Sequence, residues 1–405
     1  MRIVLTSESY LPYVSGVTVS VDALARGLGA AGHEVMVVAP RPARGTRVEP
    51  VGSPGPAPIM AWLPSYRPPA IVPPRYRMPW PILASSGWRA ARAFAPDVVH
   101  AHSPFVSGVL ARRLARTASV PLIFTHHTRF DDYSHYAGPL SAVARHTTNA
   151  WLGAWWRGSD AVIAPSFDLA GWIRERIAPG SASRVHAIPT GVDVAGIRAL
   201  ATADVRALAG WPEGSVVIAS LGRLAPEKSP ELLIDAFAGV AGRHPRLRLL
   251  VVGGGPSDGG LRARVLAAGL TDRVHFTGPL PRTVALATVA GADIFAFASR
   301  SETQGLVLAE ALTAGLPAVA VEGPGVRDSV RDGIDGVIVA HEPTDTLVVR
   351  LGRAIAALAD DPDRREALAR SAKEDAERFS LSRQVGAVEA LYRLTRERRQ
   401  HASTA

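Results

Sequence analysis

The chain contains no cysteine among its 405 residues. This absence excludes a disulfide framework and any metal site that depends on thiolate ligands. No run of 18 or more uninterrupted apolar residues occurs, so the sequence predicts no membrane-spanning helix. The opening MRIVLT has the pattern of a buried strand rather than of a cleavable signal, and we therefore expect a cytoplasmic protein.

The absence of other sequence motifs excludes further functional classes. No phosphate-loop lysine motif is present, which argues against phosphate-loop NTPases. The net charge is +9, but no nucleic-acid recognition module is visible, so we expect no nucleic-acid partner. With 47% hydrophobic and 20% charged residues, a chain of this length is typical of a folded protein of two or three domains.

Positive charge is concentrated in the first half of the chain. Residues 1–195 hold 19 arginines against 11 acidic residues, whereas the rest holds 26 basic and 25 acidic residues. Aromatic residues accompany these arginines in two segments: Trp62, Tyr66, Tyr76, Trp80 and Trp88, and then Trp151, Trp155 and Trp156. Such groups suit an anionic membrane surface on the inner face of the plasma membrane. A proline-rich surface loop and an ordinary core helix would produce the same pattern, and both interpretations stay open.

Strand-like and helix-like segments alternate from the first residue onward. Strands are expected at 2–8, 33–40, 96–102, 120–127, 160–166 and 183–191, with a helix at 19–32. This alternation is typical of parallel βαβ units, and it predicts a doubly wound α/β domain over residues 1–195.

The alternation starts again at Ser215 and predicts a second doubly wound domain over residues 196–378. Its strands are expected at 215–224, 246–255, 274–278, 292–299 and 317–321. Gly, Asp and Pro cluster at 192–214, which we interpret as the linker. The C-terminal segment 379–405 contains one more helix, which we expect to pack back on the first domain.

The segment SRSETQGLVLAEALTAGLPAVAV at 299–321 places Glu302 and Glu310 eight residues apart. If a helix opens near Gly305, one carboxylate lies on the loop before it and the other lies two turns along the same side. The two carboxylates could then reach different hydroxyls of one long ligand. The free N–H groups at the helix start suit an anion between them. A sugar joined to a ribose through a diphosphate has this layout.

A second charged motif, GRLAPEKSP at 222–230, leaves a strand and enters a helix. Lys228, five residues after Arg223, is one of only two lysines in a chain with 43 arginines. A compact ammonium group on a helix-entry loop suits a phosphate oxygen. A solvated charged turn is the alternative.

Glycine-bearing loops follow two of the expected strands. Ser15 and Gly16 stand at the entry of the first helix, where backbone N–H groups could meet an anion, although a simple turn has the same composition. Gly253, Gly254 and Gly255 follow a strand of the second domain, and we expect them to form a structural turn.

The segment FTHHTRFDDYSHYAGP at 124–139 collects histidines and acidic residues, but it lacks a helical two-histidine metal pattern. We favour hydroxyl recognition, with His127 at a strand end contacting a sugar. The residues that could line an acceptor pocket are Arg129, Tyr133, His135 and Tyr136. Asp361-Pro362-Asp363 matches a DxD string, but it lies in a polar loop, and we expect Asp361 to be a helix cap.

Together these motifs resemble the retaining glycosyltransferases of family 4, which have the GT-B fold of two Rossmann-like domains facing a central cleft. The resemblance covers nearly the whole chain. It is carried by five matches: Glu302 to Glu310, Arg223 to Lys228, Gly16, His127 before threonine, and Ile188 to Asp193. Two residues depart from the family pattern, since Thr190 replaces an asparagine and Ser15 replaces a glycine.

The resemblance implies a role for each matching residue. Glu302 and His127 would be the catalytic residues that hold hydroxyls of the transferred sugar, and Glu310 would hold the ribose hydroxyls. The remaining donor-binding residues would be Gly16, Arg223 and Lys228 for the diphosphate, and the backbone of Thr303, Gln304, Gly305 and Leu306 near the sugar; residues 274–280 would pass the nucleobase. The resemblance also implies retention by front-face displacement, closure of the two domains around the donor, and no required metal or other cofactor.

Residues 125–139 are similar to the corresponding part of bacterial enzymes that glucosylate diacylglycerol from UDP-glucose. We therefore expect transfer of a hexose from a nucleotide sugar, with UDP-glucose favoured, to a hydroxyl of a membrane lipid such as diacylglycerol. A GDP-mannose-dependent mannosyltransferase acting on a glycolipid or phosphatidylinositol is the near alternative, followed by a transferase with a soluble acceptor. A nucleotide-sugar epimerase and a non-catalytic membrane-surface binding protein are the alternatives from other classes.

Overall fold

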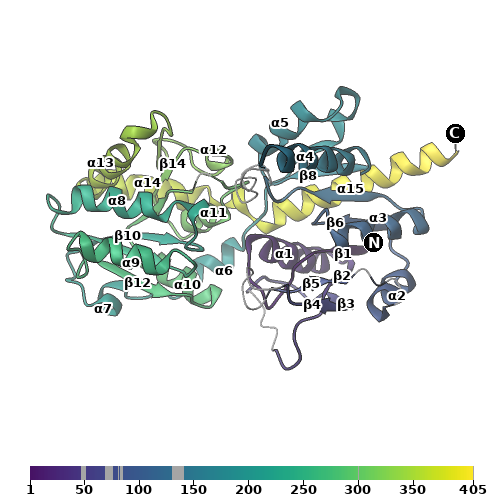
Figure 1. The fold of residues 1–405 in the computed structure, drawn as a ribbon, viewed down its shortest axis with the longest axis horizontal. Coiled ribbons are helices and arrows are strands. Elements are labelled where there is room, and N and C mark those ends of the chain that lie inside the picture. Colours follow the sequence, from purple (N-terminus) through teal and green to yellow (C-terminus); the bar gives the residue numbers. More distant parts are fainter. Residues whose placement is uncertain are drawn as a thin grey trace. The chain divides into compact units, whose positions relative to one another are not determined.

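The structure is a computed structural model that describes residues 1–46, 52–68, 76–80, 82, 85–129, 141–299 and 301–404. It contains two compact units (Figure 1). Unit 1 comprises residues 1–191 together with 380–405, and unit 2 comprises residues 192–379.

Unit 1 is built on a seven-stranded parallel sheet. In spatial order its strands are β3 (Ile59–Leu63), β2 (Glu34–Pro40), β1 (Arg2–Thr6), β6 (Val98–Ala101), β7 (Leu122–Thr125), β8 (Ala161–Ala164) and β9 (Val185–Ala187). The helices are α1 (Gly16–Ala30), α2 (Ser86–Ala93), α3 (Val106–Ala118), α4 (Ser141–Arg157), α5 (Phe167–Arg176), the 3-10 helix η2 (Pro179–Arg184) and α15 (Leu381–Thr404). A short hairpin joins β4 (Ser65–Tyr66) to β5 (Met78–Pro79). The six expected strands are present, and the edge strand β3 was not predicted.

Unit 2 contains a six-stranded parallel sheet. Its strands are β12 (Val274–Gly278), β11 (Leu247–Val252), β10 (Val216–Leu221), β13 (Ile294–Phe297), β14 (Ala318–Val321) and β15 (Gly336–Val339). The longer helices are α8 (Pro230–Ala241), α9 (Asp258–Ala267), α10 (Arg282–Ala290), α11 (Leu306–Thr313), α13 (Leu347–Asp360) and α14 (Pro362–Glu374). The shorter ones are α6 (Val194–Arg198), α7 (Val205–Ala209), η3 (Pro226–Lys228), α12 (Val326–Ser329), η4 (Thr344–Thr346) and η5 (Ala376–Phe379).

Each sheet is buried on both faces, as the continuous apolar runs of its strands require. In unit 1, Val4 and Val99 belong to the core on one face, whereas Ile3 and Val98 belong to the core on the other. The direction of the crossovers reverses between β1 and β6 in unit 1 and between β10 and β13 in unit 2. The predicted fold class of two doubly wound α/β domains is confirmed, and each domain has one topological switch point.

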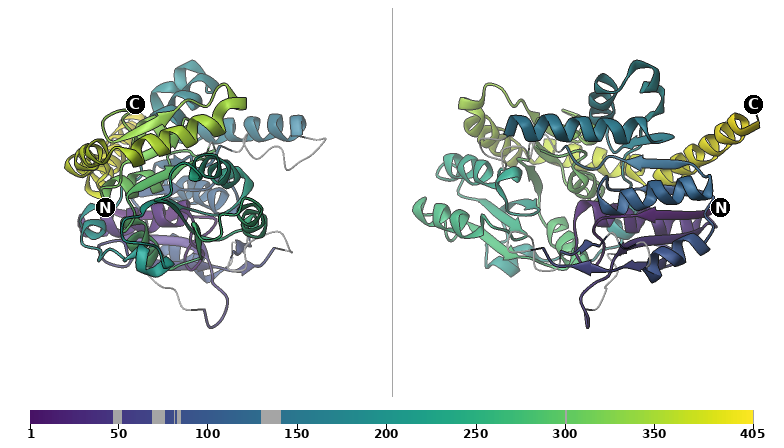
Figure 2. Two further views of the ribbon diagram at one scale, coloured as in Figure 1. Left: turned by 90° about the vertical axis from the view of Figure 1, so that its left-hand side faces the viewer. Right: turned by 45° about the vertical axis from the view of Figure 1, so that its right-hand side comes forward.

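Helix α15 belongs to unit 1, although it follows unit 2 in the sequence. Leu381, Val385 and Leu391 are buried in the core that also contains residues of α1. The Tyr392 hydroxyl lies 2.6 Å from His100 Nδ1 at the end of β6. The last turns of α15 extend away from the sheet (Figure 2).

The prediction of a linker at 192–214 was wrong. This segment forms α6 and α7, and its apolar residues are buried in the core of unit 2: Val192, Val194, Ile197, Val205 and Trp211. The boundary between the units follows Gly191 instead. The Gly, Asp and Pro residues of this segment cap and separate short helices, as Asp193 and Asp204 do by accepting backbone N–H groups.

The second aromatic segment is part of an ordinary core helix. In α4, the exposed fractions of Trp155 and Trp156 are 2% and 1%, and the Arg112 guanidinium lies 3.9 Å from the centre of the Trp155 ring. Of the first segment, Trp88 is buried and Trp80 is 49% exposed. Within the residues that the structure describes, no helix is long and apolar enough to cross a membrane.

We predict that Gly253→Ala destabilises unit 2 by about 2–4 kcal/mol. Gly253 has a φ of +132°, and an added Cβ would lie 2.0 Å from the Gly222 carbonyl oxygen. Urea unfolding of the whole chain would measure the change. Gly260→Ala is the matched control, because nothing lies within 4 Å of its added Cβ and the residue is inside α9; we expect it to be neutral or slightly stabilising. Equal stability of the two variants would contradict this prediction.

Candidate functional site

In unit 2, charged residues meet at the carboxyl ends of β10 and β13. These strands are parallel neighbours, so the loops that follow them lie at the same edge of the sheet. Lys228, at the end of η3, places its Nζ 2.5 Å from Glu302 Oε1. The Ser301 hydroxyl donates to the Glu227 carbonyl oxygen at 2.7 Å, and Arg223 lies 3.7 Å from the Glu227 carboxylate. The two motifs predicted from sequence therefore form one cluster.

Helix α11 begins as predicted, directly after Gly305. This glycine has a φ of +72° and caps the helix without a side-chain hydrogen bond. The loop before it is packed against Gly325, where an added Cβ would lie 2.8 Å from the Thr303 carbonyl oxygen. Glu302 is therefore on the loop and Glu310 is in the second turn of α11. Helix α11 starts at the sheet edge that carries Lys228 and Glu302, because the loop before it follows β13.

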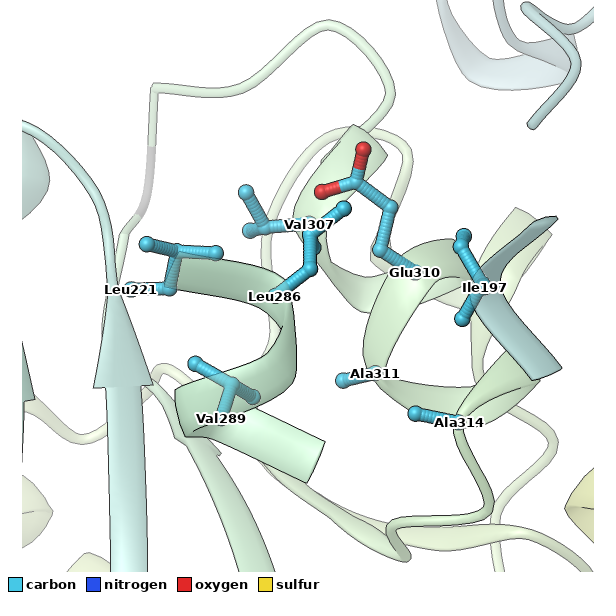
Figure 3. A pocket seen from close by; sticks show the side chains of 8 residues that line it. All are labelled: Ile197, Leu221, Leu286, Val289, Val307, Glu310, Ala311 and Ala314. Carbon is cyan, nitrogen blue, oxygen red and sulfur yellow. The ribbon is translucent and has the colours of Figure 1, made fainter. Parts of the chain in front are cut away.

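Glu310 is buried, with 1% of the residue exposed, and forms an ion pair with Arg282 at the start of α10. Its second oxygen, Oε2, has no hydrogen-bond partner within the described part of the chain. A small hollow lies next to Glu310, whose carboxylate points away from Ala311 and Ala314 (Figure 3). The other lining residues are apolar: Ile197, Leu221, Leu286, Val289 and Val307. Glu310 Oε2 is thus a fixed, buried carboxylate oxygen that the described residues leave without a hydrogen-bond donor.

Sequence reasoning missed Arg282. It stands four residues after β12, and nothing in the sequence distinguishes it from the other 42 arginines. Its role follows only from burial, because a buried carboxylate such as that of Glu310 requires a cation or hydrogen-bond donors beside it.

Two other predictions in unit 2 are confirmed. The glycines after β11 form a structural turn. The Gly253 N–H donates to the Gly278 carbonyl oxygen at 3.2 Å, and the Gly254 carbonyl oxygen accepts the Leu224 N–H at 3.1 Å. This turn supports the loop that carries Arg223. Asp361 is a helix cap, because its Oδ1 accepts the Arg364 N–H at 2.9 Å at the start of α14.

In unit 1, Ser15 and Gly16 lie at the start of α1 as predicted. Ser15 and Thr18 form a reciprocal capping box, with Ser15 Oγ accepting the Thr18 N–H at 3.3 Å. An added Cβ on Gly16 would meet nothing within 4 Å. The protein's own packing therefore does not require a glycine at this position.

His127 belongs to a group of histidines at the ends of β6 and β7. Its Nε2 lies 2.9 Å from His102 Nδ1, so one imidazole donates and the other accepts. His100 is held between Tyr392 and the Thr125 hydroxyl, each at 2.6 Å. Burial lowers the pKa of His100 and His126 to about 3 and of His127 to about 4, and it lowers the pKa of His102 well below its usual value. All four are therefore neutral at pH 7.

The predicted acceptor residues are placed only in part. Arg129 lies 3.5 Å from Asp168, and its guanidinium is 5.4 Å from the centre of the Trp172 ring. Tyr133, His135 and Tyr136 lie outside the described residues. Among the residues with described positions, no group of three or more His, Asp or Glu side chains could hold a metal ion.

Comparison with known proteins covers both units. Residues 14–195 match the family described as Glycosyltransferase Family 4, and residues 203–375 match Glycosyl transferases group 1. The first match contains Gly16 and His127. The second contains Arg223, Lys228, Glu302 and Glu310.

Two curated relatives and one solved structure are similar over most of the chain. A GDP-mannose-dependent alpha-mannosyltransferase of Mycobacterium tuberculosis is 31% identical, covering 90% of this chain and 89% of the relative. An alpha-monoglucosyldiacylglycerol synthase of Streptococcus pneumoniae is 27% identical, covering 84% of this chain and 76% of the relative. The structure of a sucrose-phosphate synthase from Thermosynechococcus elongatus has a TM-score of 0.76 at 21% identity, covering 97% of this chain and 98% of that chain.

We predict that the stability of the protein falls as the pH is lowered from 6.5 to 5. The four neutral histidines have folded pKa values below their unfolded value of about 6.5, so in this window the unfolded state binds more protons. Each contributes a loss of up to about 1.4 kcal/mol per pH unit, and we expect at least about 2 kcal/mol in total. Burial raises the pKa of Glu8, which acts in the opposite direction but is a single group.

Urea unfolding at pH 6.5, 5.8 and 5 would measure this loss, with pH 8 against pH 7.5 as the control, where these histidines contribute no change. A free energy of unfolding that stays constant down to pH 5 would contradict the neutral state of the four histidines.

Proposed function

Because this chain belongs to glycosyltransferase family 4 and has the two doubly wound domains of the GT-B fold, we propose that it transfers a hexose from a nucleotide sugar to a hydroxyl of a membrane lipid. UDP-glucose is the favoured donor and diacylglycerol the favoured acceptor. The observation that carries the proposal is the pair of Lys228 and Glu302 before the start of α11, with the buried Glu310 in the second turn of that helix.

This cluster fits a nucleotide diphosphate sugar. Glu310 Oε2 would accept hydroxyl groups of the ribose, and the N–H groups at the start of α11 would meet the phosphate next to the sugar. Lys228 and Arg223 would neutralise the diphosphate. Lys228 is paired with Glu302. A phosphate that takes the ammonium group would leave the Glu302 carboxylate to the hydroxyls of the sugar.

The mechanism we propose retains the anomeric configuration. The bond from the anomeric carbon to the phosphate oxygen breaks, and the acceptor oxygen bonds to the same face of that carbon. The acceptor's proton passes to the departing phosphate oxygen. Lys228, Arg223 and the N–H groups of α11 stabilise the negative charge of the leaving diphosphate, so this scheme requires no metal. Glu302 and the neutral His127 hold sugar hydroxyls, and neither forms a covalent bond.

The lipid acceptor is proposed from two features. The pneumococcal relative is named a monoglucosyldiacylglycerol synthase. Unit 1 carries the excess of arginine, and Trp80 exposes half of its surface there, which suits association with an anionic membrane surface. The second candidate is a GDP-mannose-dependent mannosyltransferase acting on a glycolipid or phosphatidylinositol. The name of the mycobacterial relative, which matches 90% of the chain, favours it.

We predict that release of nucleotide from one UDP- or GDP-sugar depends on vesicles that contain lipid acceptor and falls about 100-fold or more in Glu302→Gln. A panel of UDP- and GDP-sugars, each with and without diacylglycerol or phosphatidylinositol vesicles, would identify the donor. Asp235→Asn is the matched control, because this carboxylate belongs to a surface ion pair with Arg264 in the same unit.

The outcomes separate the alternatives. Release that does not depend on lipid would indicate a soluble acceptor. Conversion of the donor sugar without release of nucleotide would indicate an epimerase. No release from any donor, or full activity of Glu302→Gln, would contradict the proposed function.

We also predict that Glu310→Gln raises the KM for the donor about tenfold or more, because a charge-assisted hydrogen bond to the ribose is lost. The effect should largely disappear when the donor lacks the ribose hydroxyls that Glu310 binds. Comparing 2′-deoxy and 3′-deoxy donors with the normal donor, in both native and variant enzyme, forms a double-mutant cycle. Equal effects of the substitution on normal and deoxy donors would show that Glu310 does not contact these hydroxyls.

A further inference from the structure

Arg282 and Glu310 form an ion pair that joins two helices of unit 2. Arg282 is the first residue of α10, and Glu310 lies in the second turn of α11. Arg282 Nη2 donates to Glu310 Oε1. The side chain of Glu310 is 1% exposed, whereas that of Arg282 is 21% exposed. The guanidinium group is therefore closer to solvent than the carboxylate that it holds.

The position of Arg282 is not explained by its own helix. A cation in the first turn of a helix is disfavoured, because the helix dipole is positive there. The first turn of α10 contains no acidic residue, and Pro281 provides no side-chain cap. Arg282 shares a face of α10 with Leu286, four residues later, and Leu286 lines the hollow beside Glu310 (Figure 3). The arginine is thus directed toward α11, where its partner lies.

The stability of α11 does not explain Glu310 either. The residues from Leu308 to Thr313 are all buried, so the carboxylate interrupts an apolar part of the core. Burying an ion pair costs the solvation of both charges, and replacing such a pair with apolar residues is often neutral or stabilising. Glu310 Oε2 has no donor among the described residues, although buried polar atoms are nearly always hydrogen-bonded. A pair that adds little stability and leaves one oxygen unpaired fits a role in binding.

We propose that Arg282 is a positioning residue for donor binding, an inference that rests on the proposed function. It holds Oε1 of Glu310, which leaves Oε2 for a hydroxyl group of the donor's ribose. Without Arg282, the carboxylate would be a buried charge with no cation beside it, so it would take up a proton or turn toward solvent. Either change would remove the acceptor from the position in which it binds the ribose. Arg282 therefore acts through Glu310 and not by contacting the donor.

Binding of UDP and GDP tests this role without turnover, because both nucleotides carry the ribose and the diphosphate. Isothermal titration calorimetry of the whole chain would give the Kd for the native protein, Arg282→Gln, Glu310→Gln and the double variant. We expect Arg282→Gln to raise the Kd of the nucleotide that binds about tenfold. In the Glu310→Gln background the same substitution should change the Kd less than about twofold, because no carboxylate is left to position.

Two further variants separate positioning from loss of stability. Arg282→Lys keeps a cation beside Glu310 and should raise the Kd less than about threefold. Arg206→Gln is the matched control, because this partly buried guanidinium pairs with Asp293, which precedes β13 at the opposite edge of the same sheet. It should lower the Tm and leave the Kd unchanged. If Arg282→Gln alone does not fold, comparing Glu310→Gln with the double variant still decides, since neither contains a buried, unpaired carboxylate.

A direct contact between Arg282 and the diphosphate would give a different result. Arg282→Gln would then weaken binding equally in the native and Glu310→Gln backgrounds, which would overturn the positioning role. An unchanged Kd in Arg282→Gln, or a native protein that binds neither nucleotide, would overturn it as well.

Transfer and positioning can fail separately. Nucleotide binding with the expected coupling, but no release from any UDP- or GDP-sugar, would contradict the proposed function and support the role of Arg282. Release by the native enzyme, with the effect of Arg282→Gln retained in Glu310→Gln, would support the proposed function and overturn that role. In an active enzyme, we expect Arg282→Gln to raise the KM for the donor about tenfold and to lower kcat less than about threefold, because the ribose is not the part that reacts.

Discussion

The parallel pairing of β10 with β13 is the constraint on which the site in unit 2 depends. It brings together Lys228 and Glu302, which are 74 residues apart in the sequence, at one edge of the sheet. The ion pair between them is partly exposed, so it contributes little stability by itself. The ion pair matters because of its position. It places an ammonium group, which can bind an anion, beside a carboxylate, which can accept hydrogen bonds from hydroxyl groups of the same ligand.

The ionisable groups at the two sheet edges differ in how the protein stabilises them. In unit 2, carboxylates at the site are matched by cations: Glu302 by Lys228, and Glu310 by Arg282. In unit 1, the histidines at the ends of β6 and β7 are kept neutral by burial and are linked to one another and to Tyr392. A neutral imidazole can orient a hydroxyl group without attracting an anion, whereas the ammonium group of Lys228 attracts one.

Local patterns explain what the sequence could predict. Parallel strands, the start of α11 at Gly305 and the Asp361 cap depend on residues close in sequence, and all three are present. The exceptions depend on tertiary packing. The predicted linker became α6 and α7 because its valines and Trp211 are buried, and the aromatic group of α4 faces the core. Arg282 could not be found because only the fold brings it to Glu310.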